Sequence, residues 1–268
     1  MKRILLLLLI PICWSSCKKD AGKTKEILLS EISVDGKVAT RLKYSDDNKP
    51  VRYESYTNNA LTAYFTMSYD ANGHLSELGT FSSPGDVPNS RILVECDAQG
   101  KITKATHYEL QGPAPNTPSS VSTFSYNGQN LLSKLVDKDK NDELISSTNY
   151  LYFPDGNIKE IQSFKEASNL LWMWRKVAYS VPNGYSPKGI ERLTPILGPE
   201  ITATYYCDGI QEYTYDQNGV IATHKSTIMS AREFNEDGSL KRQVQTYTSI
   251  KPVFPATVVN KSYEYILQ

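Results

Sequence analysis

Apolar and polar residues alternate over most of the chain, with breaks at regular intervals. Leu61, Ala63, Phe65, Met67 and Tyr69 occupy alternate positions, and Val38, Thr40, Leu42 and Tyr44 form a similar series. A period of two is typical of a β-strand with one buried face, because successive side chains point to opposite faces of a sheet. The pattern predicts strands throughout, and we find no convincing helix. The stretch 168–174, the only helical candidate, is better interpreted as a loop entering a strand.

A short motif separates the predicted strands. It consists of an aromatic residue or Cys, Asp or Asn, polar residues, Gly and an aliphatic residue, and it occurs at 69–75, 96–102, 153–158, 215–220 and 234–240, with looser copies at 34–38, 126–128 and 207–210. Asp and Asn stabilise turns and Gly supplies a positive φ, so the motif predicts hairpins. Gly73, Gly100, Gly128 and Gly156 are spaced by 27, 28 and 28 residues. The spacing predicts a repeated unit of two strands.

Longer reversals rich in Pro or charged residues lie between these turns, at 83–89, 112–118 and 137–142. We therefore expect tight turns at one end of the sheet and long loops at the other. The pattern predicts about 16 strands between Glu26 and Leu267 in an up-and-down antiparallel meander. An open sheet of that size would expose its edges and curl, so a single all-β domain over 26–268, closed into a barrel or roll, is favoured.

The N-terminus has the features of a secretory signal. Met1-Lys2-Arg3 precedes an apolar run that is too short for a transmembrane helix of about 20 residues. Trp14-Ser15-Ser16-Cys17 resembles a bacterial lipobox, in which Cys17 becomes the lipidated first residue of the mature protein. The sequence predicts a signal peptide at 1–16, a linker at 17–25 and a membrane anchor of acyl chains on Cys17. A freely secreted protein that is cut nearby is the alternative.

The Tyr-Asp-x-x-Gly pattern resembles the YD repeats of Rhs-type shell proteins. The chain also has Cys17 and a length of 268 residues. With the three features together, it is similar to an uncharacterised Bacteroidetes lipoprotein family with a porin-like β-barrel fold. The resemblance covers residues 26–268. It implies a barrel that is lipid-anchored to the outer membrane and faces either the periplasm or the cell surface. It carries no catalytic residues to transfer.

Composition narrows the class of protein. The 29 basic and 29 acidic residues exclude a strongly basic nucleic-acid binder, and the 40% hydrophobic content excludes a disordered chain. The 18 Tyr, against 7 Phe and 3 Trp, favour half-buried β surfaces.

A barrel wall in lipid needs an outward apolar band, but predicted strands at 101–107 and 159–163 carry several charges. We therefore expect a water-soluble barrel with its apolar face inward.

Motifs for catalysis and for cofactors are absent from the sequence. There is no GxSxG, no phosphate-binding Gly loop and no Rossmann fingerprint, so no cofactor is expected. His74, His107 and His224 fall in three different hairpins without metal-ligand spacing, so no metal site is expected. Cys96 and Cys207 either form a disulfide in an oxidising envelope or fill core positions as small apolar residues.

Aromatic residues supply the main candidate for a binding site. Trp172 and Trp174 share one face of an extended strand by alternation, and Tyr185 follows. They either form a ligand platform, for instance for a glycan, or fill the barrel core. We expect a non-enzymatic envelope lipoprotein whose long loops bind a ligand, a glycan or an envelope protein. A glycan-acting hydrolase with carboxylates in the barrel mouth and a purely structural envelope component are the alternatives.

Overall fold

The computed structural model describes residues 26–83, 85, 87–110, 117–165, 170–178 and 208–268. They form sixteen β-strands. The strands are β1 (Ile27–Val34), β2 (Lys37–Tyr44), β3 (Pro50–Thr57), β4 (Ala60–Tyr69), β5 (Leu75–Ser82), β6 (Ser90–Cys96), β7 (Ile102–Glu109), β8 (Thr117–Tyr126), β9 (Leu132–Asp139), β10 (Leu144–Tyr152), β11 (Ile158–Lys165), β12 (Leu170–Ala178), β13 (Gly209–Tyr215), β14 (Ile221–Phe234), β15 (Leu240–Lys251) and β16 (Phe254–Leu267). The predicted all-β architecture of about 16 strands is confirmed. Across the described ranges, no helix has the length and apolar character needed to cross a membrane.

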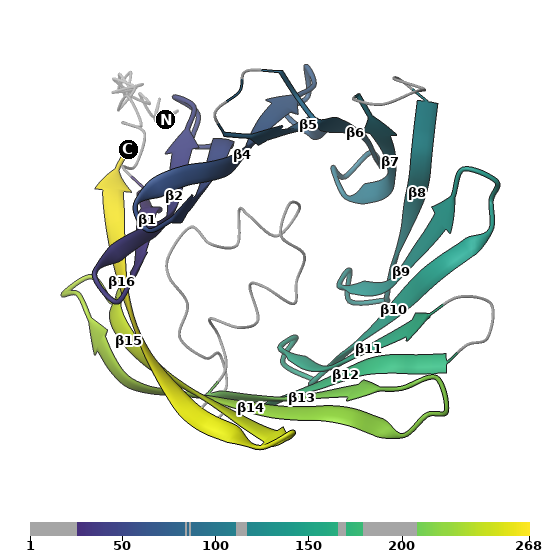
Figure 1. The fold of residues 1–268 in the computed structure, drawn as a ribbon. Coiled ribbons are helices and arrows are strands. Elements are labelled where there is room, and N and C mark those ends of the chain that lie inside the picture. Colours follow the sequence, from purple (N-terminus) through teal and green to yellow (C-terminus); the bar gives the residue numbers. More distant parts are fainter. Residues whose placement is uncertain (1–25, 84, 86, 111–116, 166–169, 179–207) are drawn as a thin grey trace, which may run out of the picture.

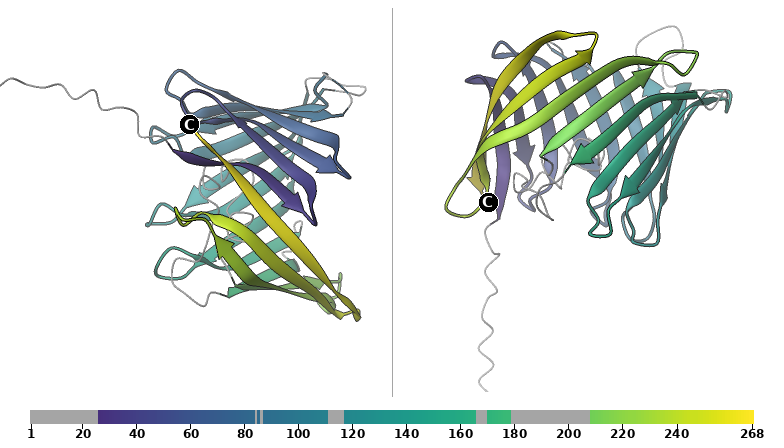
Figure 2. Two further views of the ribbon diagram at one scale, coloured as in Figure 1. Left: turned by 90° about the vertical axis from the view of Figure 1, so that its left-hand side faces the viewer. Right: turned by 90° about the horizontal axis from the view of Figure 1, so that it is seen from below.

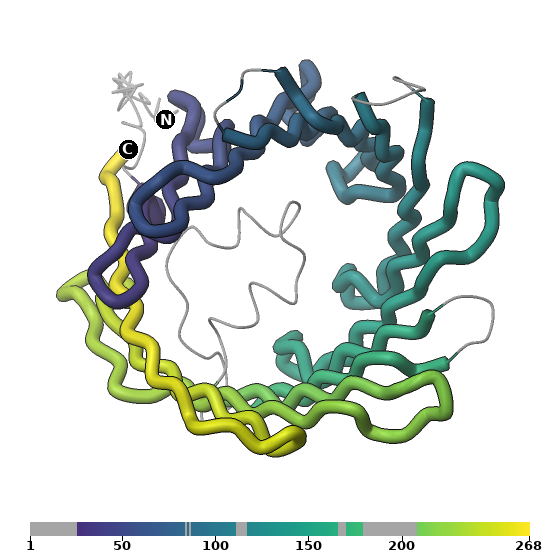
Figure 3. Tube along the Cα trace, in the orientation of Figure 1, coloured from purple at the N-terminus to yellow at the C-terminus, as the bar shows by residue number. Residues whose placement is uncertain are grey.

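The strands form one closed barrel. Each pairs antiparallel with the next along the chain, and β1 pairs with β16 to close the wall. Figures 1 and 3 show the chain following the circumference of the barrel in sequence order, from purple β1 to yellow β16. The closing register runs from Ile27 opposite Leu267 to Val34 opposite Lys261. Closure removes the exposed edges that an open meander would leave.

The repeated Asp or Asn closes the tight turns through its side chain. Asp70 Oδ1 accepts hydrogen bonds from the backbone N–H groups of Asn72 and His74, at 2.9 and 2.8 Å. Gly73 at the fourth position has a φ of +81° and donates its N–H to Asp70 O. Asp97, Asn127, Asp139 and Asp216 each accept the same pair of bonds. The motif is therefore an Asx turn with a left-handed fourth residue.

One turn departs from the predicted glycine spacing. In the turn after β8, Asn130 has a φ of +63° and occupies the position of Gly73, whereas Gly128 lies outside the left-handed region. Asn tolerates this conformation better than most residues, so it replaces glycine there. The loose copy at Asp208-Gly209 is no turn at all. Asp208 N–H donates to Ala178 O at 2.8 Å, and Gly209 begins β13.

The barrel has two distinguishable ends. The terminal end holds Glu26, Gln268 and the turns at 45–49, 70–74, 97–101, 127–131, 153–157 and 235–239. The far end holds the turns at 35–36, 58–59, 140–143, 216–220 and 252–253. Tight turns thus occur at both ends, and the predicted separation of tight turns from long loops is wrong. β12 ends and β13 begins at the terminal end. β13 therefore runs towards the far end, where the Asp216 turn follows it.

Tyrosine hydroxyls bridge neighbouring hairpins at the terminal end. A tyrosine at or near the end of a strand donates to a carbonyl at or near the start of the preceding strand, over 2.6 to 2.8 Å. The pairs are Tyr44 with Leu29, Tyr69 with Pro50, Tyr126 with Ile102, Tyr152 with Leu132, and Tyr265 with Leu240. Between β5 and β6 the position is held by Cys96, whose Sγ lies 3.6 Å from Leu75 O. The aromatic residue of the repeat therefore joins one hairpin to the next.

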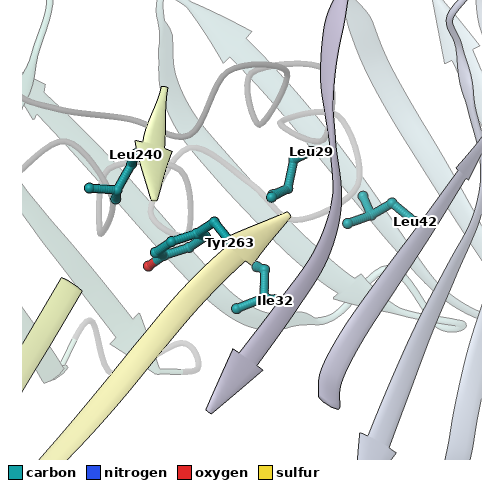
Figure 4. Packing of buried hydrophobic residues seen from close by; sticks show 5 residues of the cluster. All are labelled: Leu29, Ile32, Leu42, Leu240 and Tyr263. Atoms are coloured by element: carbon teal, nitrogen blue, oxygen red, sulfur yellow. The ribbon is translucent and has the colours of Figure 1, made fainter. Parts of the chain in front are cut away.

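Apolar side chains gather on one face of the wall, near the terminal end. One cluster joins the first two and last two strands through Leu29, Ile32, Leu42, Leu240 and Tyr263 (Figure 4). Two further clusters centre on Ile161 and on Met67. Side chains on the concave face of a closed sheet converge, whereas those on the convex face spread apart, so this face lines the interior.

The opposite, outer face carries ion pairs. Arg41 pairs with Glu31 at 2.8 Å, and Arg52 and Lys43 both pair with Glu54, at 2.7 and 3.2 Å. These residues alternate along their strands with the apolar interior residues, so they point outward. The alternation predicted from the sequence therefore places the apolar clusters on the interior face and these ion pairs on the outer wall.

Candidate functional site

Three aromatic side chains lie next to one another on the outer wall. Trp174 on β12, Tyr213 on β13 and His224 on β14 are direct cross-strand partners. They alternate with interior residues such as Val177, so they point outward. The centroids of the Trp174 and Tyr213 rings are 5.8 Å apart, tilted by 38°, and those of Tyr213 and His224 are 4.3 Å apart and stacked. We call these three residues the aromatic row.

Polar groups hold the edges of the aromatic row. Trp174 Nε1 donates to Glu160 Oε2 at 3.0 Å. His224 Nε2 lies 2.7 Å from Gln211 Oε1, and because an amide oxygen only accepts, the imidazole donates this bond. Gln211 Nε2 donates in turn to Ser226 Oγ at 2.8 Å. The two outer rings, Trp174 and His224, are therefore each fixed at the edge by a partner on an adjacent strand, Tyr213 lies between them, and all three are half-buried.

A lysine covers one face of the tryptophan. Lys176 Nζ lies 3.9 Å from the centroid of the Trp174 ring, within the range of a cation–π contact, and the residue is exposed to solvent. The cross-strand series continues from Trp174 to Gln162 on β11 and Asn149 on β10. The aromatic row is therefore continued by amide side chains along the same line of the wall.

The predicted platform residues are only partly brought together. Trp174 lies on the outer wall, so the alternative that it fills the core is wrong. Trp172 sits at a β-bulge, because Met173 pairs with Ser163 and Leu171 with Phe164, and it is 38% exposed. Tyr185 lies outside the described residues. The sequence pattern missed Tyr213 and His224 because their proximity to Trp174 depends on the pairing of β12, β13 and β14.

A second polar cluster faces the interior, towards the far end. Asp137 Oδ1 accepts from Ser122 Oγ at 2.6 Å, and Oδ2 accepts from Ser146 Oγ at 2.8 Å. His107 Nε2 lies 3.3 Å from the same Ser122 Oγ. Burial lowers the pKa of His107, against the opposing effect of the Asp137 charge. Because the carboxylate bonds the serines and not the imidazole, it does not orient His107 as a general base, in contrast to a Ser-His-Asp triad.

The remaining sequence candidates do not form a site. Cys96 is a free thiol and Cys207 lies outside the described residues, so their disulfide stays a prediction. Cys17 lies outside them too. Within the part of the chain that the structure describes, no group of three or more His, Cys, Asp or Glu side chains is placed to hold a metal ion.

Comparison with known proteins identifies the fold. No protein-family model matches the chain, and no curated protein matches it. The structure resembles a porin-like protein from Bacteroides uniformis, with a TM-score of 0.56 and 13% identity, over 91% of this chain and 97% of the other. It also resembles a porin-like protein from Bacteroides vulgatus, with a TM-score of 0.53 and 10% identity, over 90% and 99% of the two chains. At these identities the likeness establishes a porin-like barrel fold.

Proposed function

We propose that this protein is a non-enzymatic lipoprotein of the cell envelope that binds a glycan through the aromatic row. The observation that carries the proposal is the contiguous set of rings on Trp174, Tyr213 and His224 on the outer wall, in which hydrogen bonds fix the edges of Trp174 and His224. Aromatic rings are enriched at recognition surfaces because they offer a large rigid contact area at a low cost in conformational entropy.

The charged outer wall supports a barrel that stands in water. A barrel embedded in lipid presents an apolar band on the outward face of its strands. Here Glu31, Arg41 and Glu54 occupy that face on β1, β2 and β3, and Lys104 pairs with Glu95 at 2.8 Å on β7 and β6. Several charged residues in one lipid-facing band would be strongly unfavourable. The barrel therefore holds its site in the aqueous part of the envelope.

An acyl anchor on Cys17 sets the orientation of the barrel. Glu26 lies nine residues after Cys17, and it exchanges two backbone hydrogen bonds with Gln268 at the terminal end. Nine extended residues span at most about 30 Å. The terminal end therefore lies close to the membrane, and the far end points away from it. The aromatic row, on the side wall, stays accessible in this orientation.

The chemistry around Trp174 fits a sugar ring. The C–H groups of a pyranose carry partial positive charge and pack on the electron-rich face of an indole, which attracts the Lys176 ammonium in the structure. Glu160 and Gln162, at the edge of the indole, supply acceptors and donors for hydroxyl groups. Lys176 is exposed, so it can leave the ring face when a sugar arrives.

Glycan binding is tested with a chain carrying Cys17→Ala. The protein is screened on an array of neutral and acidic oligosaccharides, and the best ligand is titrated by calorimetry. We expect Trp174→Ala to weaken binding about 30-fold, the effect of a hot-spot residue worth about 2 kcal/mol. Trp172→Ala is the matched control on the same strand and changes affinity less than twofold. Lys176→Ala frees the ring face and strengthens binding.

Two results would overturn glycan binding. The first is an array without any ligand for the folded protein. The second is loss of binding in Lys176→Ala together with full binding in Trp174→Ala, which means that charge and not stacking recognises the ligand. The anchor is tested separately: the chain with Cys17 incorporates radiolabelled palmitate and fractionates with membranes, whereas Cys17→Ala is soluble without detergent. A Cys17→Ala protein that still requires detergent contradicts a water-facing wall.

A further inference from the structure

The aromatic row is part of a longer line of side chains on the outer wall. Each member of this line is the direct cross-strand partner of the next, and each pair lies in an unshifted stretch of its ladder. The line crosses the wall from β9 to β14 and consists of Lys134, Asn149, Gln162, Trp174, Tyr213 and His224. We call these residues the outer line. The right-hand view of Figure 2 shows this wall from outside, with green β13 and β14 next to the teal strands that precede them.

Interior neighbours confirm the outward orientation of the polar end of the outer line. Direct cross-strand partners point to the same face of a sheet, so the whole line shares the face of the aromatic row. Leu135 follows Lys134 in the sequence and packs against an interior apolar cluster, so Lys134 faces outward. Asn149 faces outward by the same alternation, because Tyr150 is a buried member of that cluster.

The spacing of the outer line matches that of an extended glycan. Neighbouring strands lie about 4.8 Å apart, which is close to the length of one sugar in an extended chain. Lys134 and Trp174 are three such steps apart, or about 14 Å, and the whole line spans about 24 Å. Groups with this period contact successive sugars of one chain. Because the outer wall is convex, the chain has to bend to follow it, which favours flexible linkages over a stiff polymer.

The chemistry of the outer line changes from aromatic to polar and then to positive. Its two amide side chains offer donors and acceptors for sugar hydroxyl groups. Near Trp174, the charge of Glu160 is offset by Lys176, its direct cross-strand partner, and by Lys159 at 3.8 Å. Lys134 is exposed, and within the described chain its ammonium has neither an ion pair nor a hydrogen bond. This unpaired positive charge favours a ligand with negative groups.

We propose that the glycan ligand is an extended, flexible and acidic chain that lies along the outer line, an inference that rests on the proposed glycan binding. One sugar stacks on Trp174, and the next sugars on either side contact Tyr213 and the amide side chains. An acidic group further along the chain pairs with Lys134. Contacts that are linked in one chain raise the affinity above that of a single sugar, so the line selects a polymer.

The length and charge of the ligand are tested by calorimetry on the Cys17→Ala chain. The probes are hyaluronan fragments of two, four, six and eight sugars, which form a flexible linear chain with a carboxylate on every second sugar. We expect the affinity to rise about 30-fold from two to six sugars and then to level off, because the outer line spans about 24 Å. Chitin fragments of the same lengths are the neutral, stiffer control and should bind about fivefold more weakly than hyaluronan.

Lys134→Ala tests whether the chain reaches β9. It should weaken binding of the six-sugar fragment about fivefold, the effect of a solvent-exposed charge pair. It should leave the two-sugar fragment unaffected, because two sugars at Trp174 do not span the distance of about 14 Å to Lys134. Lys138→Ala is the matched control. It removes the same charge from the same face of β9 but lies about 13 Å along the strand, and it should change affinity less than twofold. Lys134→Arg keeps the charge and should retain binding.

The extended site and glycan binding itself fail in different ways. Equal affinity for all fragment lengths, or equal effects of Lys134→Ala on the two-sugar and six-sugar fragments, overturns the extended site. Chitin binding as tight as hyaluronan binding, or a neutral glycan bound while hyaluronan is not, overturns the acidic ligand. In these cases Trp174→Ala still weakens binding, so the aromatic row keeps its role. If Trp174→Ala leaves the binding of every glycan unchanged, or no glycan binds, the proposed function is wrong.

Discussion

Replacing Cys96 by tyrosine is expected to stabilise the barrel. At five of the hairpin junctions at the terminal end, a tyrosine hydroxyl reaches a carbonyl at or near the start of the preceding strand. Between β5 and β6 the thiol of Cys96 is 3.6 Å from Leu75 O, a weak contact. A groove of about 590 Å³ opens at this junction, lined by Asp70, Asn72, His74, Leu75, Ser76, Val94, Cys96, Asp97 and Ala98. The phenol ring of Cys96→Tyr occupies part of that groove.

The size of the gain follows from three contributions. Half-burying a tyrosine ring removes about 100 Å² from water, which is worth about 2.5 kcal/mol at about 25 cal/mol per Å². A hydrogen bond to Leu75 O adds about 1 kcal/mol. Ordering the side chain costs about 1 kcal/mol. The net effect on the free energy of unfolding is about 2.5 kcal/mol, or a rise in Tm of about 5–10 °C for a domain of this size.

The assay is thermal and urea unfolding followed by circular dichroism, with Cys96→Phe as the control. Phenylalanine fills the groove equally well but cannot donate to Leu75 O, so it should recover all but about 1 kcal/mol of the gain. The reasoning is refuted if Cys96→Tyr is less stable than the parent protein. Equal stability of Cys96→Tyr and Cys96→Phe refutes the hydroxyl bridge while leaving the filling of the groove in place.

Three further predictions concern pH and turn chemistry. Burial, and less strongly the charge of Asp47, raises the pKa of Tyr69 to about 12. The stability that the neutral Tyr69 hydroxyl contributes is therefore complete below about pH 10, the ordinary pKa of tyrosine, and is lost as pH rises through about 12. The urea midpoint of Tyr69→Phe should therefore fall less steeply over this pH range than that of the parent protein. Burial lowers the pKa of His107, so the folded protein favours the neutral imidazole. The free energy of unfolding should therefore fall as pH drops below about 6.5, the ordinary pKa of histidine, and it should fall less steeply in His107→Gln. Asp97→Ala removes the acceptor for two backbone N–H groups and should cost about 1–2 kcal/mol in urea unfolding, whereas Asp97→Asn should cost less because Asn127 closes the equivalent turn.

Local sequence chemistry predicted the wall of the barrel well. Alternation gave the strands, and the Asp or Asn of each motif gave the reversals, because the side chain closes its own turn through nearby backbone groups. Such contacts lie within four residues, so they are visible in the sequence. Gly128 shows the limit of this reasoning: the motif was aligned on glycine, but Asn130 adopts the left-handed conformation.

The candidate site could not be predicted to the same degree, because it depends on contacts between strands. Trp174, Tyr213 and His224 belong to three strands, and only the register of β12, β13 and β14 places them side by side. Simple alternation grouped Trp174 with Trp172, but a β-bulge intervenes between the two positions. A shift of one residue in strand register reverses the face of every side chain, so a sequence period cannot identify such neighbours.

The aromatic row lies where the repeat loses its regularity. From β1 to β11 the strands have 7 to 10 residues and neighbouring hairpins share one plan of turns. After β12 the turn order changes, and β14, β15 and β16 extend to 14, 12 and 14 residues. The regular units follow the local strand and turn preferences of the sequence and close the barrel wall. In natural proteins, positions that depart from such local preferences are often functional sites. The aromatic row and the part of β16 that extends beyond β1 both lie in this irregular part. A single deletion that shortened the β15–β16 hairpin to the length of its neighbours would therefore remove the part of β16 that extends beyond β1 without opening the barrel, because the closing register between Ile27 and Val34 lies outside the deleted segment.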